Sequence, residues 1–443
     1  MGSMTFSTRR WSANLVFLLI SSGFHWKFAH AFTDTILQGQ SITTSQTIIS
    51  AGGNFELGFF SPGNSTNYYV GIWYKKVSGQ VSDKTIVWVA NREYAFKNPS
   101  VVLTVSTDGN LEILEEKFAY KVTSISSNRN TSATLLDSGN VVLRNDNSTI
   151  LWQSFDYPSH AFLPGMKIGY DKRAGKTWSL TSWKSTEDPS PGVFSLAHDP
   201  NGTSQNFILQ GSARYWTSGS WNGQIFSLVP EMRVDDIFNY SYSINKDESY
   251  FNYSLYDSSI IRILVLDVSG QIKQRKWLDS SHQWNLFWAR PRTKCEVYAS
   301  CGPFGICHES AVDGFCECLP GFEPVSPNNW NSDEGCVRKA DLQCGNTTHA
   351  NGERDQFRQV SDVILPDYPL TLPARSAKEC KSACLNNCSC SAYAYDRETC
   401  TVWSGDLLNL RKPSDYTSNG QDFYLKLAAP EPNGRGNKFK EWS

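Results

Sequence analysis

The sequence predicts a mainly β protein in two parts, one that buries its own core and one that depends on disulfide bonds. Between residues 32 and 290, short runs of tryptophan and β-branched residues alternate with polar residues, and Gly, Asn, Asp and Ser separate the runs. This pattern is typical of strands joined by turns. All 12 cysteines lie between Cys295 and Cys400, as expected of small modules with little core of their own. No amphipathic helix is predicted before residue 290.

The composition argues against several classes of function. The chain has 41 Lys and Arg against 43 Asp and Glu, so its formal charge is −2 and no global field attracts nucleic acid or an anionic membrane. Hydrophobic residues are 40% and charged residues 19% of the chain, which indicates a folded rather than a disordered protein. The 443 residues are enough for about three average domains.

A signal peptide is predicted over residues 1–31, so that the mature chain begins at Phe32. Arg9 and Arg10 precede an apolar run at 15–20, and a small-x-small cleavage site follows at 29–31. A membrane anchor is the alternative, but the apolar run is well short of the ~20 residues that a spanning helix needs. The sequence contains no second apolar stretch of that length, so we expect a soluble, extracellular chain.

Eight Asn-x-Ser/Thr sequons follow the signal peptide and indicate a glycosylated exterior protein. They are Asn64, Asn130, Asn147, Asn201, Asn239, Asn252, Asn346 and Asn387. Asn387 is the least secure of them, because its middle residue is Cys388 and a disulfide there would restrict access.

A short internal repeat of the form Gly-Asn-apolar-x-apolar occurs at 53–57, 109–113 and 139–143. Its Gly-Asn pair suits a tight turn with positive φ, and the residues after it alternate between the two faces of a strand. Three copies predict three similar β units around one core. The alternative is three unrelated hairpins.

Residues 152–290 form a second block that is rich in aromatic residues and free of cysteine, and we expect it to have its own core. A strand at 260–266, a turn at Ser269-Gly270 and a returning strand are predicted near its end. Tyr215, Trp216 and Trp221, with Asn222, could line a groove for an apolar or peptide ligand. Tryptophans in a β domain more often belong to the core, and we favour that interpretation.

The first six cysteines lie at 295, 301, 307, 316, 318 and 336, and sequence alone permits 15 pairings of them. Their spacing resembles that of an EGF-like module. A zinc site is disfavoured, because no His/Cys pairs stand at ligand spacing and the expected compartment is oxidising. Calcium-binding EGF-like modules carry an acidic cluster before the first cysteine, whereas residues 289–294 are basic, so no metal and no other cofactor are expected.

The second group of six cysteines surrounds a predicted helix. Ser376 and Glu379 form a capping box, and the helix that begins there places Cys380 and Cys384 on one face. These cysteines can attach the helix to a sheet formed by 392–395 and 400–403. This arrangement, with its Cys-x3-Cys-Leu-x2-Asn-Cys-Ser-Cys run, resembles a PAN/apple module.

The order of parts is specific. Six short stretches of the β-rich part are equally specific to one family: FELGFFSPG at 55–63, VGIWY at 70–74, WVANR at 88–92, LWQSFD at 151–156, LPGMK at 163–167 and TSWKS at 181–185. The chain resembles the extracellular region of a plant S-domain (G-type lectin) receptor-like serine/threonine kinase, from about residue 34 to residue 429.

The resemblance implies two tandem bulb-type lectin-like β-prism domains, followed by an EGF-like and an α+β PAN/apple module. The implied boundaries are 32–151 for the first lectin-like domain, 152–290 for the second (the S-locus glycoprotein region), 291–337 for the EGF-like module, 344–428 for the PAN/apple module and 429–443 for a juxtamembrane linker. The implied disulfides are Cys295–Cys307, Cys301–Cys316, Cys318–Cys336, Cys344–Cys388, Cys380–Cys400 and Cys384–Cys390.

Bulb-type lectins bind mannose through Gln-x-Asp-x-Asn-x-Val-x-Tyr, and this motif is degenerate here. The best copy keeps Asp108 and Asn110 but has Ser106, Glu112 and Leu114 at the other positions. Another copy keeps Asn140. Asp108, Asn110 and Asn140 are therefore the candidate sugar-binding residues, although turn formation explains the Asp-Gly-Asn run adequately.

No catalytic residues are assigned, because the five histidines after the signal peptide are scattered and no nucleophile elbow, zinc motif or phosphate-binding loop occurs. Kinase motifs are absent from the chain, so phosphotransfer would belong to a longer parent, attached by a membrane span outside this sequence. The expected function is a cell-surface receptor ectodomain that binds an extracellular peptide, lipid or glycan and controls receptor association, as a homodimer or with a co-receptor. The alternatives are a mannose-binding lectin and a secreted S-locus-type glycoprotein without a kinase.

Overall fold

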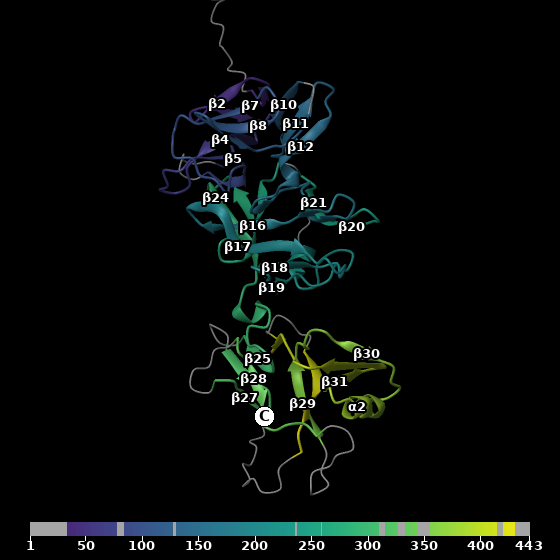
Figure 1. The fold of residues 1–443 in the computed structure, drawn as a ribbon. Coiled ribbons are helices and arrows are strands. Elements are labelled where there is room, and N and C mark those ends of the chain that lie inside the picture. Colours follow the sequence, from purple (N-terminus) through teal and green to yellow (C-terminus); the bar gives the residue numbers. More distant parts are fainter. Residues whose placement is uncertain are drawn as a thin grey trace, which may run out of the picture. The chain divides into compact units, whose positions relative to one another are not determined.

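The computed structural model describes residues 33–77, 84–126, 130–234, 237–257, 259–309, 315–326, 333–343, 355–413 and 420–429. The predicted signal peptide, all but the first residue of the predicted linker, Asn346 and Cys344 lie outside these residues. The chain divides into two compact units, Met1–Phe155 and Asp156–Ser443, which are described separately below (Figure 1).

The described part of the first unit contains three four-stranded antiparallel sheets. The first has the order β1 (Thr35–Leu37), β10 (Thr131–Leu135), β11 (Val141–Asn145) and β12 (Ile150–Gln153). The second has the order β2 (Ser41–Thr43), β7 (Val102–Val105), β8 (Leu111–Glu115) and β9 (Phe118–Lys121). The third has the order β3 (Thr47–Ile49), β4 (Phe55–Phe60), β5 (Tyr69–Tyr74) and β6 (Ile86–Val89).

The core of the first unit lies between these three sheets. Each sheet contributes apolar side chains to it, and in the third sheet β5 and β6 are buried along their whole length. Fully buried examples are Ile36, Ile48, Leu57, Ile72 and Leu103. The first three strands of the chain each enter a different sheet, so a single N-terminal segment ties all three sheets together.

The three Gly-Asn copies lie in three different sheets, before β4, β8 and β11, and each glycine has a positive φ. Two of the copies are equivalent, because β8 and β11 are both third in their sheets. The copy at Gly53 precedes β4, which is second in its sheet. The prediction of three units around one core is therefore confirmed, while the copy at Gly53 lies in a different turn from the other two.

The boundary expected after residue 151 falls inside β12, which runs to Gln153. The first compact unit extends to Phe155. The reason is local, because Ser154 and Phe155 both donate hydrogen bonds to Asn140 within that unit.

The second unit begins with three further four-stranded sheets. The first has the order β13 (Ala161–Phe162), β22 (Arg262–Leu266), β23 (Ile272–Leu278) and β24 (Gln283–Arg290). The second has the order β15 (Lys176–Trp178), β14 (Ile168–Asp171), β21 (Glu248–Leu255) and β20 (Phe238–Ile244). The third has the order β16 (Leu180–Ser185), β17 (Asp188–His198), β18 (Asn206–Gln210) and β19 (Ala213–Thr217). The expected strand, turn and return near residue 266 are β22, a turn with Gly270 at positive φ, and β23. Both blocks thus have the three-sheet architecture of a β-prism.

The C-terminal part of the second unit contains a three-stranded, a two-stranded and a five-stranded sheet. The three-stranded sheet has the order β26 (Phe315–Cys318), β25 (Gly305–His308) and β33 (Leu410–Arg411). The two-stranded sheet pairs β27 (Phe322–Pro324) with β28 (Cys336–Arg338). The five-stranded sheet has the order β29 (Gln356–Val363), β34 (Gln421–Leu427), β31 (Cys390–Asp396), β32 (Thr399–Ser404) and β30 (Leu370–Leu372). Because β33 pairs with β25, a strand of the predicted PAN/apple module completes a sheet of the predicted EGF-like module. A single hydrophobic cluster that includes Phe322 and Trp403 also spans both modules.

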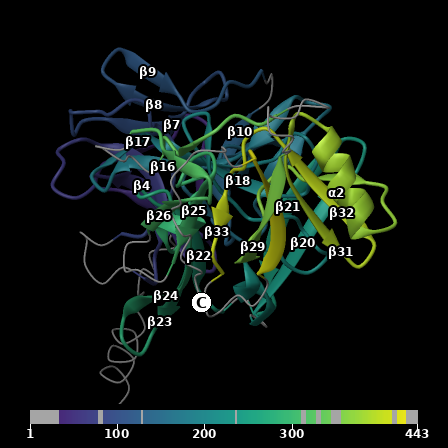
Figure 2. The same cartoon turned by 90° about the horizontal axis from the view of Figure 1, so that it is seen from below.

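Helix α2 (Ala377–Asn386) packs on β31 and β32 (Figure 2). The predicted cap is present, since the Ser376 side chain accepts a hydrogen bond from the backbone N–H of Glu379 at 3.2 Å. The Glu379 carboxylate bonds back to the N–H of Arg375 at 2.7 Å, one residue earlier than a standard capping box. Cys380 and Cys384 are buried on the face toward the sheet.

A buried histidine joins two sheets of the second unit. The Nε2 atom of His198, at the end of β17, lies 2.5 Å from the hydroxyl of Tyr242 on β20. Its Nδ1 atom lies 3.0 Å from Oδ1 of Asn206, and the Ser249 hydroxyl is 3.4 Å from Nε2. Burial lowers the pKa of His198 below its ordinary value, although Asn206 and Asp199 oppose the shift.

We expect this histidine to make the second unit less stable in acid. Its folded-state pKa is lowered, so below about pH 6.5 the unfolded chain binds a proton that the folded chain does not. Stability is therefore present above that pH and falls with further acidification, by at most about 1.4 kcal/mol per pH unit. Urea unfolding between pH 7.5 and 4.5 should show a smaller pH dependence in His198→Gln. The exposed His282 gives the control His282→Gln, and an unchanged slope in His198→Gln would contradict the assignment.

Candidate functional site

The candidate sugar-binding residues Asp108 and Asn110 lie in the turn between β7 and β8. The Asp108 carboxylate accepts hydrogen bonds from the Ser106 hydroxyl at 2.5 Å and from the N–H of Asn110 at 3.1 Å. Its other oxygen lies 3.3 Å from Nζ of Lys121. The Ser106 bond, with the help of the Asn110 and Lys121 bonds, holds the pKa of Asp108 well below its ordinary value.

The side chain of Asn110 is directed into the protein and is only 3% exposed. Its Oδ1 atom accepts hydrogen bonds from the Thr123 hydroxyl at 3.0 Å and from the N–H of Ile125 at 2.8 Å. Its amide nitrogen donates to the carbonyl oxygen of Ile125 at 3.3 Å. The amide thus fixes the chain that leaves β9, and it is not presented to a ligand.

Asn140 does the same in the neighbouring sheet. Its Oδ1 atom accepts from the Ser154 hydroxyl at 3.0 Å and from the N–H of Phe155 at 3.1 Å. Its amide nitrogen donates to Oε1 of Gln153 at 3.0 Å. The Ser154 hydroxyl in turn accepts a hydrogen bond from the N–H of Val141, the first residue of β11, at 2.9 Å.

The third sheet has a related contact, in which Oδ1 of Asn91 accepts from the N–H of Val70 at 2.8 Å. The sequence motifs at 88–92 and 151–156 therefore carry Asn91 and Ser154, the residues that close two of the three sheets. These motifs identified the family in the sequence but gave no sign of this role. The signal lies in a polar side chain one or two residues after the last strand of each sheet, which is Ser154 after β12, Asn91 after β6 and Thr123 after β9.

The face of β8 on which the lectin motif would present its side chains carries an ion cluster. Lys121 on β9 contacts Asp108 at 3.3 Å and Glu112 at 3.5 Å. Glu112 occupies the motif's valine position and is buried. These internal contacts replace the carboxylate, amide and apolar surface that the sugar motif requires, so the geometry argues against mannose recognition at these residues.

Replacing Asn110 by alanine is expected to destabilise the first unit by about 2–3 kcal/mol, because buried partners lose their hydrogen bonds. Asn54, in the Gly-Asn copy at residues 53–57, is the matched control, since its half-buried side chain has no hydrogen bond in the described structure. Asn54→Ala should change stability by no more than about 0.5 kcal/mol. Thermal unfolding of the purified variants measures both effects, and equal losses would show that Asn110 has no special structural role.

The aromatic residues proposed for a groove are engaged in packing. Trp216 is buried, and the ring centroid of Tyr215 lies 4.9 Å from that of Phe194. Trp221 is half-buried against Phe226, with ring centroids 5.2 Å apart. These contacts agree with the core interpretation for this set.

The structure contains five described disulfides, which join the pairs Cys295–Cys307, Cys301–Cys316, Cys318–Cys336, Cys380–Cys400 and Cys384–Cys390. Cys388 is also disulfide-bonded, but Cys344 is outside the described residues, so the implied Cys344–Cys388 bond stays a prediction.

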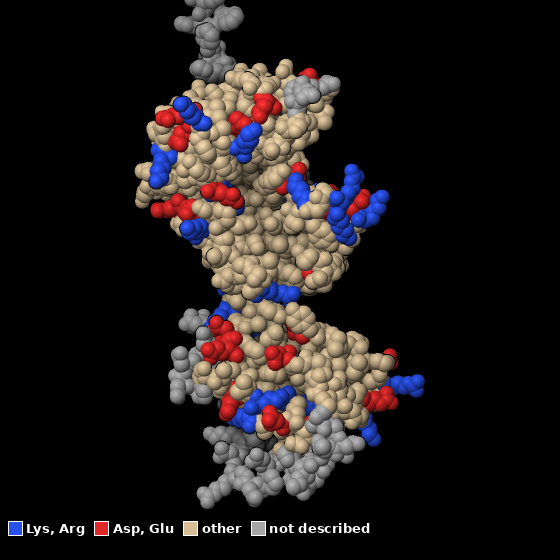
Figure 3. Space-filling view, viewed as in Figure 1, with Lys and Arg blue, Asp and Glu red and all other residues tan. Residues whose placement is uncertain are grey.

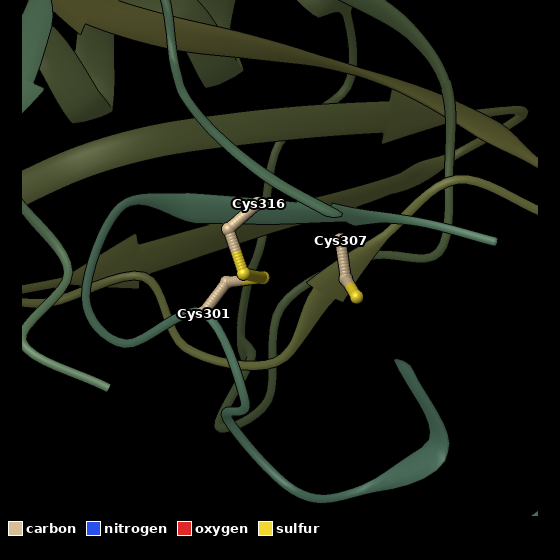
Figure 4. A group of neighbouring side chains, drawn as sticks. All are labelled: Cys301, Cys307 and Cys316. Carbon is tan, nitrogen blue, oxygen red and sulfur yellow. A yellow bond between two sulfur atoms is a disulfide. The ribbon is translucent and has the colours of Figure 1, made fainter. Parts of the chain in front are cut away.

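The sulfur atoms of Cys301, Cys307 and Cys316 lie within 4.8 Å of one another (Figure 4). Cys301 is bonded to Cys316, and Cys307 to Cys295. Metal binding needs the thiolate form of cysteine. The three sulfur atoms therefore belong to two neighbouring disulfides of the EGF-like module and offer no metal site in the oxidised protein.

Most of the predicted glycosylation sites are accessible in the structure. The exposed asparagines are Asn64, Asn130, Asn147, Asn201, Asn239 and Asn387, and Asn252 is half-buried. The Asn387 side chain accepts a hydrogen bond from the Ser389 hydroxyl at 2.9 Å, next to the disulfide-bonded Cys388. Occupancy of all eight sites stays a prediction.

Three family models match the chain. They are the D-mannose binding lectin at residues 85–184, the S-locus glycoprotein domain at 216–326 and the PAN-like domain at 344–410. SRK of Arabidopsis thaliana, named as an inactive G-type lectin S-receptor-like serine/threonine-protein kinase, is 34% identical, and the match covers 88% of this chain and 71% of that protein. The chain belongs to the G-type lectin S-receptor-like serine/threonine-protein kinase family.

Other members of the G-type lectin receptor-like kinase family match as well. A G-type lectin S-receptor-like serine/threonine-protein kinase of Arabidopsis thaliana is 45% identical over 90% of this chain and 49% of its own length. The receptor-like serine/threonine-protein kinase SD1-8 of the same plant is 35% identical over 91% of this chain and 48% of its own length. The chain thus spans about half the length of these curated relatives.

Two solved lectin structures are among those that resemble part of the chain. A monomeric monocot mannose-binding lectin from Gastrodia elata covers 28% of this chain at 17% identity, with a TM-score of 0.22. The Marasmius oreades lectin also covers 28%, at 14% identity and a TM-score of 0.21.

This member of the G-type lectin receptor-like kinase family matches its relatives through extracellular-type domains, and no kinase catalytic domain is among the three that match. Among the described residues, no helix has the length and apolar character needed to cross a bilayer.

Proposed function

We propose that this chain is the extracellular ligand-binding region of a cell-surface receptor kinase, and that its ligand changes the association of receptor chains. The observation that carries the proposal is the family match over 90% of the chain at 45% identity. The kinase would lie in a part of the protein outside this sequence and would be reached through a membrane span. The chain itself would face the cell exterior and need no cofactor.

The mechanism we propose is a population shift. A ligand that binds the associated state more tightly than the separate chains favours association in proportion to that difference in affinity. Two features of the structure support a role of this kind. The disulfides and the shared core of the C-terminal modules make a stiff body that can hold a defined separation from the membrane. On the face shown in Figure 3, charges of both signs are interspersed, which favours a specific partner over a general polyelectrolyte.

The test is the mass of the purified chain by sedimentation, before and after addition of fractionated extracellular extract. A shift from monomer to dimer that saturates, and that a protease-treated or boiled fraction fails to give, would support ligand-dependent association and indicate the class of ligand. An unchanged mass in every fraction would overturn ligand-driven association of this region. A dimer present before any addition would also overturn it, in favour of a preformed dimer.

The mannose-lectin alternative predicts saturable binding on a glycan array that free mannose displaces and that Asp108→Ala abolishes. The internal hydrogen bonds of Asn110 and Asn140 argue against that result. The alternative of a secreted glycoprotein without a kinase is tested by whether the transcript continues beyond Ser443 into an apolar span.

A further inference from the structure

The second unit contains two bodies, the three-sheet block at residues 161–290 and the C-terminal modules from residue 294 onward. The hydrophobic cluster that joins the C-terminal modules consists of residues between Phe304 and Leu425, and it includes no described residue of the three-sheet block. Two bodies of one chain are expected to move relative to each other unless a large apolar interface prevents it. The contacts at their junction therefore decide whether the second unit is rigid.

One arginine of the three-sheet block reaches the C-terminal modules. Arg214, on β19, has a side chain that is 25% exposed, and its Nη1 atom lies 3.8 Å from Oδ2 of Asp367. Its guanidinium carbon also lies 4.1 Å from the ring centre of Phe207 on β18, 5.0 Å from that of Tyr298 and 5.8 Å from that of Tyr368. Aromatic rings attract a partly desolvated cation more strongly than an exposed one. The Arg214 cluster, which is these five residues, thus joins the two bodies.

A short chain of hydrogen bonds lies beside the Arg214 cluster. The N–H of Tyr298 donates to the carbonyl oxygen of Tyr215, on β19, at 2.7 Å. The next N–H, that of Ala299, donates to Oδ1 of Asn409 at 3.3 Å. The Asn409 amide in turn donates to the Asp367 carboxylate. Asp367 is therefore positioned by the same asparagine that holds the chain as it leaves the junction.

Three residues around the cluster have a left-handed backbone. The φ angle is +48° at Ala299, +59° at Tyr368 and +67° at Asn409. Residues other than glycine rarely adopt such angles, and they keep them only where the surrounding contacts hold them. Positions of this kind gather at segments that change conformation, so the strain favours a junction that opens when its contacts break.

A second set of contacts lies at the covalent link between the bodies. Arg290 ends β24 and contacts Glu231 in the three-sheet block and Glu296 at the start of the C-terminal modules. Only residues 291–293 separate Arg290 from the short helix η4 (Lys294–Glu296). A contact at the link fixes the distance between two bodies but leaves their angle free. The angle therefore depends on the Arg214 cluster, which lies beyond the link.

We propose that residues 291–298 form a hinge, and that the Arg214 cluster is the latch that holds this hinge closed. When the latch opens, the hydrogen bond from Tyr298 to Tyr215 breaks and the C-terminal modules turn about the link. A hinge here goes beyond the proposed receptor function, because it is a property of the single chain without a ligand or a second copy. It would allow an event at the three-sheet block to change the direction of the C-terminal modules.

The experiment uses the full secreted chain and measures hydrogen exchange of the Tyr298 amide, which is protected while the latch is closed. Arg214→Ala should lower this protection about tenfold, the scale expected when one partly buried cation–aromatic cluster is lost. Small-angle X-ray scattering should show a larger maximum dimension of the same variant. The amides of β31 and β34 should keep their protection, because the C-terminal modules stay folded.

Asp367→Asn removes the ion pair but leaves the aromatic rings, so it should lower the Tyr298 protection by only roughly threefold. This variant carries the test if Arg214→Ala is not secreted. Arg173→Ala and Asp406→Asn are the matched controls, at an exposed arginine of the three-sheet block and an exposed acid near Asn409. Both should leave the protection of Tyr298 unchanged.

Three results would overturn the proposal. Full Tyr298 protection in a folded Arg214→Ala chain, or an equal loss in Arg173→Ala, would remove the latch. Loss of protection in β31 and β34 as well would show that the C-terminal modules unfold instead of turning. Lower Tyr298 protection with an unchanged scattering profile would limit the change to local fraying and would remove the hinge. None of these outcomes alters the sedimentation result that tests the proposed function.

Discussion

Replacing Arg290 by methionine is expected to lower the free energy of unfolding of the second unit by about 3–5 kcal/mol, because it leaves two acids without their buried partner. Arg290 ends β24 and its side chain is only 7% exposed. One guanidinium nitrogen lies 2.7 Å from Oε1 of Glu231, and another contacts the carboxylate of Glu296. The guanidinium thereby links the last β-prism strand to the start of the EGF-like module.

Arg292→Met is the matched control for this variant. Arg292 contacts the same two acids, at 3.3 Å from Glu231 and 3.7 Å from Glu296, but its side chain is 53% exposed. Solvent screens such a pair, so the loss should stay below about 1 kcal/mol. Calorimetric unfolding of the purified variants, together with their secreted yield, measures the difference. Equal effects of the two substitutions would show that burial does not decide the strength of this ion pair.

Replacing Lys426 by methionine is expected to destabilise the C-terminal modules by about 3 kcal/mol. Lys426, on β34, is 1% exposed. Its Nζ atom lies 3.4 Å from the carbonyl oxygen of Cys384 and 3.2 Å from those of Leu385 and Asn387. These carbonyls end helix α2, where the helix dipole favours a cation. Methionine fills the space but leaves the carbonyls without a donor.

The control for Lys426→Met is Lys378→Met, at an exposed lysine in the first turn of the same helix. A cation near a helix N-terminus gains nothing from the dipole, so this change should stay within about 0.5 kcal/mol. Hydrogen exchange of the α2 amides adds a local readout, and faster exchange is expected in Lys426→Met alone. A Lys426→Met protein with unaltered stability and exchange would remove the capping role.

Local patterns in the sequence were sufficient for much of the fold. The Ser269-Gly270 turn predicted the hairpin of β22 and β23. Ser376 and Glu379 predicted the start of α2, because a cap depends on residues only three positions apart. The order of cysteines and short motifs was enough to place the chain in its family.

The candidate site was harder to assess, because the same residues suit a sugar or a turn. Asp108 and Asn110 satisfy both patterns in the sequence, and only the positions of Thr123, Ile125 and Lys121 show that they are used internally. Those partners are 13 to 15 residues away along the chain, beyond the range of a turn motif.

The sequence by itself determined the class of fold, the order of modules, the helix cap and the family, since each follows from spacing within a short segment or from motif order. The tertiary structure alone decided the roles of Arg290 and Lys426, whose partners include residues 59 and 42 positions away. Contacts of this kind form only when several sheets close around a core, and no local pattern encodes which distant backbone groups will then need a partner.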